Sequence, residues 1–575
     1  MDFYTELTSV IKKKKPNKKQ LNIIKIRLCS KHNIKKIPTD IEILLNAKKK
    51  DIPKIAPILL TKPTRTISGV AVVATMTRPF QCPHAKKGKG PCIMCPGGPK
   101  SHFGSVPQSY TGKEPATKRA IRNKYDPYLQ VFNRLEQYIV LGQDISKIEL
   151  IVMGGTFPSF PTKYQEDYIK YSLKAMNDFS SLFFTKDKFN FEKFKKFFEL
   201  PGDIHNEDRI KRIHKKLFAL KNKSQSSLEK IQTQNETSNV RNVALCIETR
   251  PDYATLKHAN EMLRLGCTRV ELGVQTVYDQ VLKKIKRGHT IKDSIDSTKV
   301  LKDLGFKVSY HMMPGLPGVD KEHDLFSLAA ILMDQDFRPD MLKLYPCMVL
   351  EGTELYNIYK KNKFKPLTTK QAAEIIAEFK DMVPKWIRIS RVQRDIPTFM
   401  TSSGVDKTNL RQYVEKELIR KKIKCNCIRC REVGHKLNKN PKLKIRLKDI
   451  EIVTQHYTAS DGNEFFISAE DTKNNILLGY CRLRFPQQYL RKEIPADSVL
   501  IRELHVFSPA LKIGKRSKTS FQHMGIGKKL LKTAEEISKS YFRDKVVIIS
   551  GIGARNYYKK LGYKKEGPYM VKQLK

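Results

Sequence analysis

The chain has 575 residues, and its 109 Lys and Arg residues against 58 Asp and Glu residues give it a formal net charge of +51. An apolar fraction of 40% is enough for packed cores, so length and composition exclude a wholly disordered chain and predict about three or four domains. The excess of positive charge is not the balanced Lys and Glu enrichment of surface ion-pair networks, and it favours a polyanionic partner.

The sequence contains no candidate for a membrane span. No stretch approaches the roughly 18 consecutive apolar residues that a span needs, and Met1–Val10 is followed by lysines rather than by an apolar signal core. We therefore expect a soluble, cytoplasmic protein with no membrane partner. Eleven cysteines are too few for a disulfide scaffold, but six of them form two tight groups, which in a reducing compartment indicates metal binding.

The first 65 residues have the highest density of positive charge, with 17 basic and 5 acidic side chains. Ile11–Gln20 reads IKKKKPNKKQ, and apolar residues between Leu21 and Leu45 recur at near-helical spacing. A lone lysine run is usually a solvated surface. With the charge of the whole chain, we interpret residues 1–65 as a basic, helical N-terminal arm that binds RNA.

Short apolar strands alternate with helices over residues 66–390. The strands are expected at Gly69–Ala74, Leu150–Met153, Val243–Ile247, Arg269–Gly273, Val308–Met312 and Met341–Tyr345, with helices such as Tyr253–Leu265 and Ile291–Leu304 between them. This alternation predicts a parallel-sheet βα barrel or partial barrel. Residues 179–239 interrupt the pattern, and we expect an insertion there that is helical at Phe189–Phe198 and flexible at Ser224–Asn239.

The first cysteine group, Cys82, Cys92 and Cys95, has the spacing C-x9-C-x2-C and follows the first predicted strand. Three thiolates on a [4Fe–4S] cluster would leave one iron without a protein ligand and able to bind a small molecule. Loops after barrel strands normally carry catalytic residues. From spacing alone, a zinc site with His84 as the fourth ligand is the alternative.

The second cysteine group, Cys425, Cys427 and Cys430, lies in the Lys- and Arg-rich segment KCNCIRCREVGH. Zn²⁺ in a closed structural site normally takes four nitrogen or sulfur ligands, so a fourth ligand is needed, and His435 is the local candidate. We predict a zinc-binding linker over residues 391–440 that fastens the barrel to the C-terminal domain.

Residues 441–575 predict a separate α/β domain with strands at Leu477–Leu483, Val499–Val506 and Val546–Ser550. Gln522, Gly525 and Gly527 form the pattern Q-x-x-G-x-G directly before a predicted helix. Glycines let the backbone amides of a helix N-terminus approach a pyrophosphate, which the helix dipole also favours.

A series of short segments, in the order in which they occur along the chain, closely resembles the catalytic subunit of Elongator, a family of tRNA uridine-modifying enzymes. The resemblance runs from about Lys62 to Lys575 and is carried by KPTRT (62–66), GVAVVA (69–74), QSYTGKE (108–114), IVMGGTF (151–157), IETRPD (247–252), ELGVQT (271–276) and YHMMPGLPG (310–318). It implies an α/β fold in which a radical-SAM partial TIM-type barrel (66–390) is followed by a GNAT acetyltransferase domain (441–575).

The resemblance also implies two metal groups. Cys82, Cys92 and Cys95 would hold a [4Fe–4S] cluster that binds S-adenosylmethionine, and the Gly154-Gly155 pair would give the methionine moiety close access to the backbone. Glu248 in IETRPD would orient the cofactor, with a structural ion pair to Arg250 as the alternative. At the zinc site, the resemblance makes Cys347 the first choice for the fourth ligand.

For acetyl-CoA, the resemblance assigns the pantetheine strand, the pyrophosphate loop and the thioester contacts. The residues are Glu503, Leu504, His505 and Val506 for the strand, Gln522, Gly525, Ile526, Gly527 and Lys528 for the loop, Tyr557 and Tyr558 near the thioester, and Lys147 from the barrel. Tyr558 is the better candidate of the two tyrosines, and core packing is the alternative for both.

The two cofactor sites, through the resemblance, predict a tRNA carboxymethyluridine synthase. A radical derived from S-adenosylmethionine would take hydrogen from the acetyl methyl of acetyl-CoA, and the methyl carbon would add to C5 of the wobble uridine. Thioester hydrolysis would then leave a carboxymethyl group. The expected partners are the tRNA anticodon stem-loop and either a second copy or Elongator-type subunits.

Two other functions remain open from the sequence. A protein lysine acetyltransferase of the histone type would use the C-terminal domain alone, although a cationic enzyme would repel Lys-rich tails. A non-catalytic tRNA-binding protein would keep both cofactor folds without the reaction.

Overall fold

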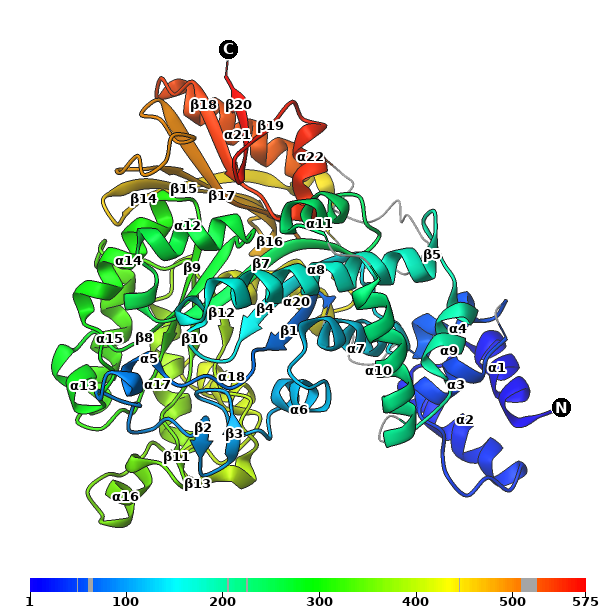
Figure 1. Ribbon diagram of the computed structural model, residues 1–575. Coiled ribbons are helices and arrows are strands. Elements are labelled where there is room, and N and C mark those ends of the chain that lie inside the picture. The colour runs from blue at the N-terminus through cyan, green and yellow to red at the C-terminus, as the bar shows by residue number, and fades with distance from the viewer. Residues whose placement is uncertain are drawn as a thin grey trace.

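The computed structural model describes residues 1–48, 50–59, 66–203, 206–223, 226–443, 445–507 and 525–574. Figure 1 shows a curved sheet at the centre, a second sheet beside the C-terminus and a small helical unit at the N-terminus. Within the described ranges, no helix has both the length and the apolar character that a membrane span requires.

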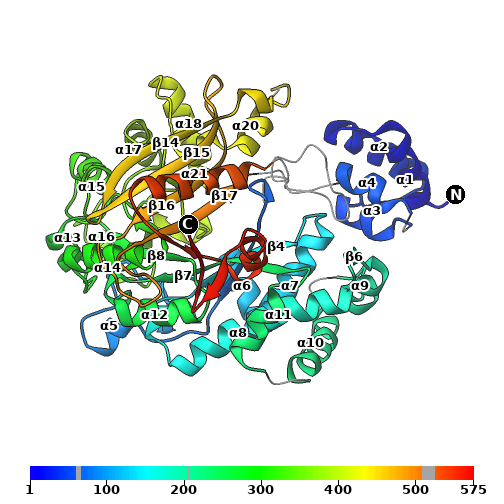
Figure 2. The same ribbon diagram turned by 90° about the horizontal axis from the view of Figure 1, so that it is seen from above.

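The N-terminal unit consists of α1 (Phe3–Lys14), α2 (Lys18–Lys31), α3 (Asp40–Asn46) and α4 (Ile52–Leu59). Capping boxes at Asn17 and Thr39 start α2 and α3. Apolar residues of the four helices, including Phe3, Leu7 and Leu21, form a core of their own. The sequence correctly predicts basic helices here, and Figure 2 shows them as a compact unit at one end of the molecule.

The central sheet is a parallel half-barrel. Its order is β1 (Ala71–Met76), β4 (Lys147–Met153), β7 (Arg241–Thr249), β8 (Arg269–Gln275), β9 (Lys307–Met312), β10 (Met341–Leu344) and β12 (Arg388–Arg391). Every neighbouring pair is parallel, and β1 and β12 end the sheet without pairing to each other. The predicted partial barrel is therefore confirmed, with β12 as a strand that its sequence, RISR, did not reveal.

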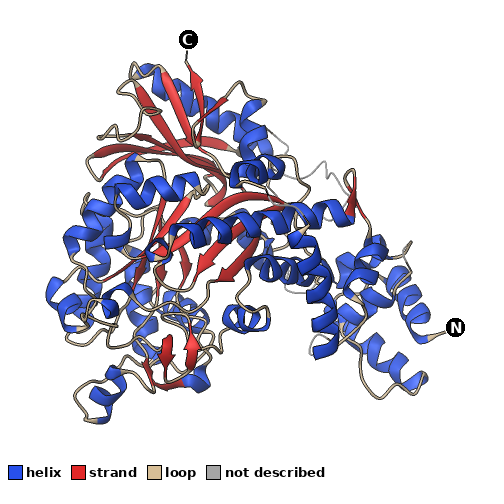
Figure 3. Cartoon of the chain, viewed as in Figure 1, coloured by secondary structure: helices blue, strands red, loops and turns tan. Residues whose placement is uncertain are grey.

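Long helices cover the outer side of this sheet (Figure 3). They are α7 (Pro127–Val140), α8 (Thr162–Phe183), α12 (Leu256–Arg264), α14 (Ile291–Asp303), α15 (Lys321–Met333) and α17 (Thr369–Asp381). Shorter elements in the connecting loops are α5 (Pro83–Lys86), β2 (Gly98–Ser101), β3 (Gly104–Val106), α6 (Pro115–Arg122), α13 (Asp279–Lys284), β11 (Val349–Leu350), α16 (Glu354–Lys360), β13 (Thr401–Ser403), α18 (Leu410–Arg420), α19 (Ile428–Arg431) and α20 (Val433–Lys439).

The segment expected as an insertion at 179–239 continues α8 and adds β5 (Phe184–Thr185), β6 (Lys188–Phe189), α9 (Phe191–Phe198), α10 (Glu207–Asn222) and α11 (Leu228–Asn235). The predicted helix at Phe189–Phe198 is confirmed as α9. The expectation of a flexible segment at Ser224–Asn239 is wrong for α11, because the buried Asn235 side chain donates to the Asn177 side chain at 2.8 Å and to the Val240 carbonyl at 3.1 Å.

The C-terminal domain is a seven-stranded sheet in the order β14 (Glu451–Ala459), β15 (Gly462–Asp471), β16 (Ile476–Phe485), β17 (Ser498–Val506), β18 (Lys545–Ile549), β20 (Tyr569–Gln573) and β19 (Lys564–Glu566). Only β17 and β18 pair in parallel. Helix α21 (Ile526–Ser540) packs on this sheet, and α22 (Arg555–Lys559) follows β18. The predicted strands at 477–483, 499–506 and 546–550 are confirmed.

A network of buried charges joins the C-terminal sheet to the N-terminal ends of the barrel strands. Arg502 donates two 2.7 Å hydrogen bonds to the two carboxylate oxygens of Asp340, which precedes β10. Arg484 pairs with Asp303 at 2.6 Å, and Glu464 contacts both arginines. Because these groups are almost fully buried, the two domains form one closely packed body.

Candidate functional site

A single cavity of about 1280 Å³ extends from the loops after the barrel strands to the C-terminal sheet. Its lining brings together most of the predicted site residues from both domains. They are Cys82, Cys92, Cys95, Lys147, Gly155, Glu248, Glu503, Leu504, His505, Val506, Gly525, Gly527, Lys528, Tyr557 and Tyr558. The two predicted cofactor sites therefore open into one space.

Two described residues predicted for the cofactor sites do not themselves line the cavity. Gly154 packs against Thr77 at the end of the first strand, and the Ile526 side chain is buried at the start of α21. Gln522 lies outside the described residues.

The cluster end of the cavity is built by the loop after β1. The three sulfur atoms of Cys82, Cys92 and Cys95 do not all lie within 4.8 Å of one another. Two sulfurs on one zinc ion, each about 2.3 Å from it, would be less than about 5 Å apart. This wider spacing fits a multi-iron cluster better than a single zinc ion.

The neighbours of these thiols also argue against zinc. His84, the candidate fourth zinc ligand, directs its Nε2 atom to Asp252 at 2.8 Å instead. The Arg287 guanidinium lies 3.6 Å from the Cys92 sulfur.

Two glycines shape the approach to the cluster end. Gly154 and Gly155 have φ angles of +120° and +115°, which L-residues rarely adopt. A Cβ atom at Gly155 would lie 3.3 Å from the Gln108 side chain, which itself lines the cavity. The glycine pair thus keeps the backbone close to the cavity.

Glu248 does not pair with Arg250, so the proposed ion pair within IETRPD is wrong. Glu248 accepts hydrogen bonds from Lys343 at 3.2 Å and from the Tyr110 hydroxyl at 3.3 Å. Arg250 instead contacts Asp252 at 3.0 Å. The Glu248 carboxylate is thereby held at the cavity wall.

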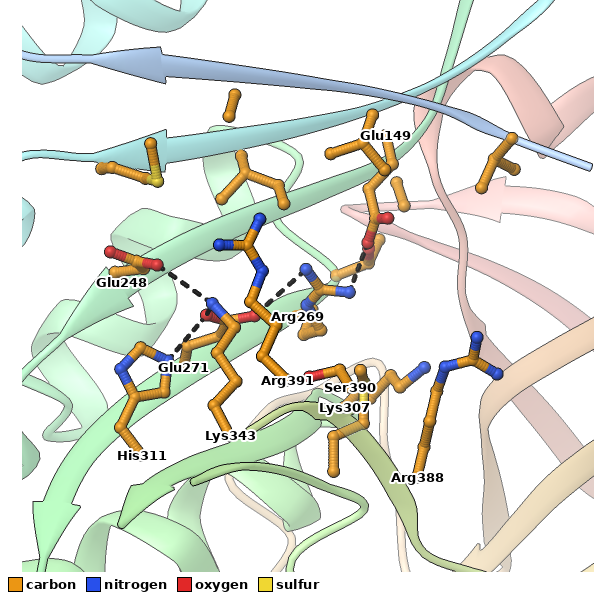
Figure 4. A pocket seen from close by; sticks show the side chains of 18 of the residues that line it. Glu149, Glu248, Arg269, Glu271, Lys307, His311, Lys343, Arg388, Ser390 and Arg391 are labelled. Carbon is orange, nitrogen blue, oxygen red and sulfur yellow. Dashed lines mark hydrogen bonds and ion pairs between the residues drawn. The ribbon is translucent and has the colours of Figure 1, made fainter. Parts of the chain in front are cut away.

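The centre of the cavity contains a charge network that the sequence did not reveal (Figure 4). Glu271 lies between Lys343, His311 and Arg269, with 2.8 Å to His311 Nε2 and 3.1 Å to the Arg269 guanidinium. Burial opposes ionisation of Glu271, but Lys343 and Arg269 lower its pKa well below the usual range. The only signal was a charged residue inside each of the apolar strands VELGVQ and MLKL.

The C-terminal end of the cavity contains the Glu503–Lys307 ion pair and the tyrosines Tyr557 and Tyr558. Glu503 contacts Lys307 and accepts a 2.7 Å hydrogen bond from Tyr480. Burial opposes ionisation of Glu503, but Lys307 and Arg482 lower its pKa to about 2. Burial raises the pKa values of Tyr557 and Tyr558, so both phenols are neutral donors at physiological pH.

Lys147 begins β4 and lines the same end of the cavity. Burial and the neighbouring Arg241 lower the pKa of its ammonium group. Gly525 and Gly527 at the start of α21 also line the cavity, and a Cβ at Gly527 would approach the Tyr557 hydroxyl to 3.0 Å.

The second cysteine group is compact. The sulfur atoms of Cys425, Cys427 and Cys430 lie within 4.8 Å of one another, as ligands of a single ion must. The Ile428 amide bonds to the Ile387 carbonyl at 2.8 Å, and Arg431 pairs with Glu470 of β15 at 2.7 Å. The group therefore lies where the barrel meets the C-terminal sheet.

Neither candidate for the fourth ligand completes this group. Cys347 packs with Ile93 and Met94 in a different cluster and is not part of the three-thiol group, so its role as the fourth ligand stays a prediction. His435 is also outside the three-thiol group, with its Nε2 atom 4.0 Å from Glu432. The group that reaches the thiols is the Lys380 amine, 3.6 Å from the Cys430 sulfur, which sequence spacing could not identify.

Comparison with protein-family models divides the chain into four matched parts. An ELP3 N-terminal domain matches residues 6–67, and the Radical SAM superfamily matches residues 82–329. A Radical_SAM C-terminal domain matches residues 339–420, and the Acetyltransferase (GNAT) family matches residues 435–563. The half-barrel is thus a radical SAM fold, and the C-terminal sheet is a GNAT fold.

Whole-chain relatives agree with this division. A tRNA uridine(34) acetyltransferase of Methanocaldococcus infernus is 47% identical over 93% of this chain and 92% of the relative. Elongator complex protein 3 of Homo sapiens is 38% identical over 96% of this chain and 93% of its own length. The solved structure of the M. infernus Elp3 with an N-terminal deletion has a TM-score of 0.71 at 41% identity, and it covers 88% of this chain and 100% of that one.

Proposed function

This chain belongs to the family of the tRNA uridine(34) acetyltransferases and Elongator complex protein 3, and from this premise we propose that it modifies the wobble uridine of tRNA. The product that we propose is 5-carboxymethyluridine, with acetyl-CoA as the source of the two-carbon group. The observation that carries the proposal is the common cavity, because it gives the radical SAM residues and the GNAT residues access to the same space.

The residues at the cluster end fit a [4Fe–4S] cluster with S-adenosylmethionine. When bound, this group supplies a 5′-deoxyadenosyl radical. Cys82, Cys92 and Cys95 would hold the cluster, while Gly155 and the Glu248 carboxylate would face the amino acid part of S-adenosylmethionine. Arg287 beside Cys92 would balance part of the thiolate charge.

The residues at the GNAT end fit acetyl-CoA. The backbone amides at the start of α21, from Gly525 to Lys528, would receive the pyrophosphate. Tyr557 and Tyr558 both line the cavity, and their hydroxyls would orient the thioester. Lys147 would contact it from the barrel side.

The tRNA would approach as a polyanion. The charge of +51 favours phosphate contacts, and a base taken out of a single-stranded anticodon loop is the form in which proteins usually read RNA. We propose the anticodon stem-loop as the bound region, a cytoplasmic location, and Elongator-type subunits or a second copy as further partners.

We also propose a structural zinc ion at Cys425, Cys427 and Cys430. It would fasten the end of the barrel to the GNAT sheet, consistent with the Ile428 and Arg431 contacts. Metal analysis of the purified protein should find one zinc per chain, and Cys427→Ser should remove it. Retention of zinc by that variant would contradict the assignment.

The test of the function uses reconstituted protein with tRNA, acetyl-CoA, S-adenosylmethionine and a reductant. Digestion and mass spectrometry of the nucleosides should reveal carboxymethyluridine at the wobble position. Cys92→Ser should keep tRNA binding and lose the product. An unmodified wobble uridine in the presence of a demonstrated cluster and bound cofactors would refute the function, and acetylation of a basic peptide without tRNA would favour a lysine acetyltransferase.

A further inference from the structure

The interior of this half-barrel is unusual in its composition. The interior of a TIM-type barrel is normally filled by layers of branched apolar side chains. Here the cavity is lined by charged side chains from six strands of the barrel, among them Lys147, Glu149, Arg269, Lys307 and Lys343. Figure 4 shows several of them directed into the cavity. We call this charged interior the bore.

The bore connects the two cofactor ends. The cysteine loop lies after β1, at the carboxyl ends of the strands, whereas the GNAT domain covers their amino ends. Close backbone packing brings the GNAT domain onto β7, because a Cβ at Gly553 would lie 2.5 Å from the Arg241 Cβ. At about 3.3 Å per residue, the strand from Lys147 to Met153 bridges about 20 Å between these ends.

Five of the charged side chains near the centre of the bore are paired with carboxylates or cations of the same cavity wall. Arg269 contacts both Glu149 and Glu271, and Lys343 contacts Glu271 and Glu248. A second ionic group is therefore not needed for charge balance at these positions. A neutral but polar guest would leave these pairs intact.

Several polar atoms of the bore nevertheless have no hydrogen-bond partner among the described residues. They include Nε of Arg241, Nε of Arg269 and Oε1 of Gln275, and all three residues line the cavity. The Arg269 side chain is only 9% exposed. An unsatisfied buried polar atom costs roughly 1–3 kcal/mol, and because neighbouring side chains cover these three atoms, a ligand in the passage could pair with them after a small side-chain movement.

We propose that the bore is the binding site for the acetyl-pantetheine arm of acetyl-CoA and that it delivers the acetyl group from the GNAT end to the cluster end. The arm is slender and neutral, and its two amides each offer one donor and one acceptor, which suits paired charges and isolated polar atoms. The nucleotide part remains at the start of α21. This inference rests on the proposed function and adds the route by which its two halves are joined.

The first test narrows the bore and measures binding. Ala74 and Val72 on β1 line the passage with small side chains. Ala74→Phe should weaken acetyl-CoA binding at least tenfold by calorimetry, while the affinity for the nucleotide portion of coenzyme A, which lacks the arm, stays unchanged. Ala74→Ser is the matched control and should bind like the wild type. Val72→Phe narrows the passage one layer nearer the GNAT end, in case the Ala74 variant fails to assemble its cluster.

Wild-type affinity for acetyl-CoA in both narrowed variants would overturn the proposal. A parallel loss of affinity for the nucleotide portion would also overturn it, because the effect would then be structural.

The second test separates the route from the reaction. With acetyl-CoA deuterated at its methyl group, the wild type should form 5′-deoxyadenosine that contains deuterium, because the methyl carbon–deuterium bond breaks and the deuterium atom forms a bond to the 5′ carbon. The narrowed variants should lose at least nine-tenths of this deuterium and still cleave S-adenosylmethionine. If the wild type transfers no deuterium, the proposed function fails. If wild type and variants transfer it equally, the function stands and the bore route fails.

Discussion

The bore of the barrel and the barrel–GNAT interface both bury many charges, but they treat them differently. At the interface, Arg484 donates to Asp303, Glu464 and two backbone carbonyls. In the bore, Arg269 has carboxylate partners but its Nε atom has no hydrogen-bond partner among the described residues. Arg484 is packed between two domains and fixes their orientation, whereas Arg269 lines a cavity that a ligand can enter.

The largest expected effect comes from breaking the interface. Arg502→Ala would leave Asp340 and Glu464 buried without their main cation, and removal of one partner of a buried pair typically costs about 3–5 kcal/mol. Chemical denaturation should therefore detect a marked loss of stability. Glu149→Gln in the bore is the comparison variant and should lose much less, because Arg269 keeps Glu271. Equal losses would mean that the two regions do not differ.

The next largest effect is expected at the contact between Glu236 of the barrel domain and α22 of the GNAT domain. Glu236, which follows α11, pairs with Arg555 at 3.2 Å and with Lys559 at 2.7 Å, and its backbone carbonyl accepts a hydrogen bond from Asn556 at 3.0 Å. These contacts hold the helix that carries Tyr557 and Tyr558. Like the interface contacts, they join the barrel to the GNAT domain, and they also support a predicted substrate site.

Glu236→Ala should therefore raise the KM for acetyl-CoA by about tenfold, equivalent to ~1.4 kcal/mol, with a smaller change in kcat. Glu236→Gln keeps the hydrogen-bonding capacity and should recover part of the loss. Steady-state kinetics at saturating tRNA would measure both. A lower kcat with unchanged KM would show that α22 positioning does not serve acetyl-CoA binding.

Acid pH should loosen the interface through Glu503. Its pKa is lowered to about 2 in the folded protein, below the value of about 4.3 for an unperturbed Glu. A depressed carboxylate pKa stabilises the fold above the unfolded value, and this stability is lost as the pH falls from about 4 toward 2. Stability measured across this window should fall less steeply in Glu503→Gln than in the wild type. Parallel curves would contradict the assignment.

The sequence predicted the scaffold better than the interior. Apolar runs such as IVM before Gly154 identify strands and their order, because burial on both faces selects β-branched and aliphatic residues. The strand RISR, β12, was missed because an arginine at each end of a four-residue segment is typical of an exposed segment. The sequence also gave no sign that Lys343 and Glu271 form an ion pair, because the two residues lie on different strands.

The metal sites illustrate the same limit. Clustered cysteines are visible in the sequence because ligands from one loop keep a short spacing. The Lys380 contact to the Cys430 sulfur was not visible in the sequence, because Lys380 comes from α17, 45 residues before Cys425. The fold places Cys347, the first choice for the fourth ligand, among apolar residues beside the first cysteine loop.

The basic side chains of the N-terminal unit differ from both buried groups because they face water, so their removal should have the smallest effect on the fold. Because α1–α4 have their own core, deletion of residues 1–59 removes basic surface without exposing the barrel interior. tRNA binding should weaken, and the slope of log affinity against log salt should become shallower by about 0.9 for each phosphate that the deleted side chains had neutralised. Iron content and the affinity for acetyl-CoA should remain unchanged, because neither the cysteine loop nor the bore receives a residue from this unit. An unchanged salt slope would place the tRNA-binding charges on the barrel and GNAT domains, and a loss of iron would instead make these helices part of the packed body.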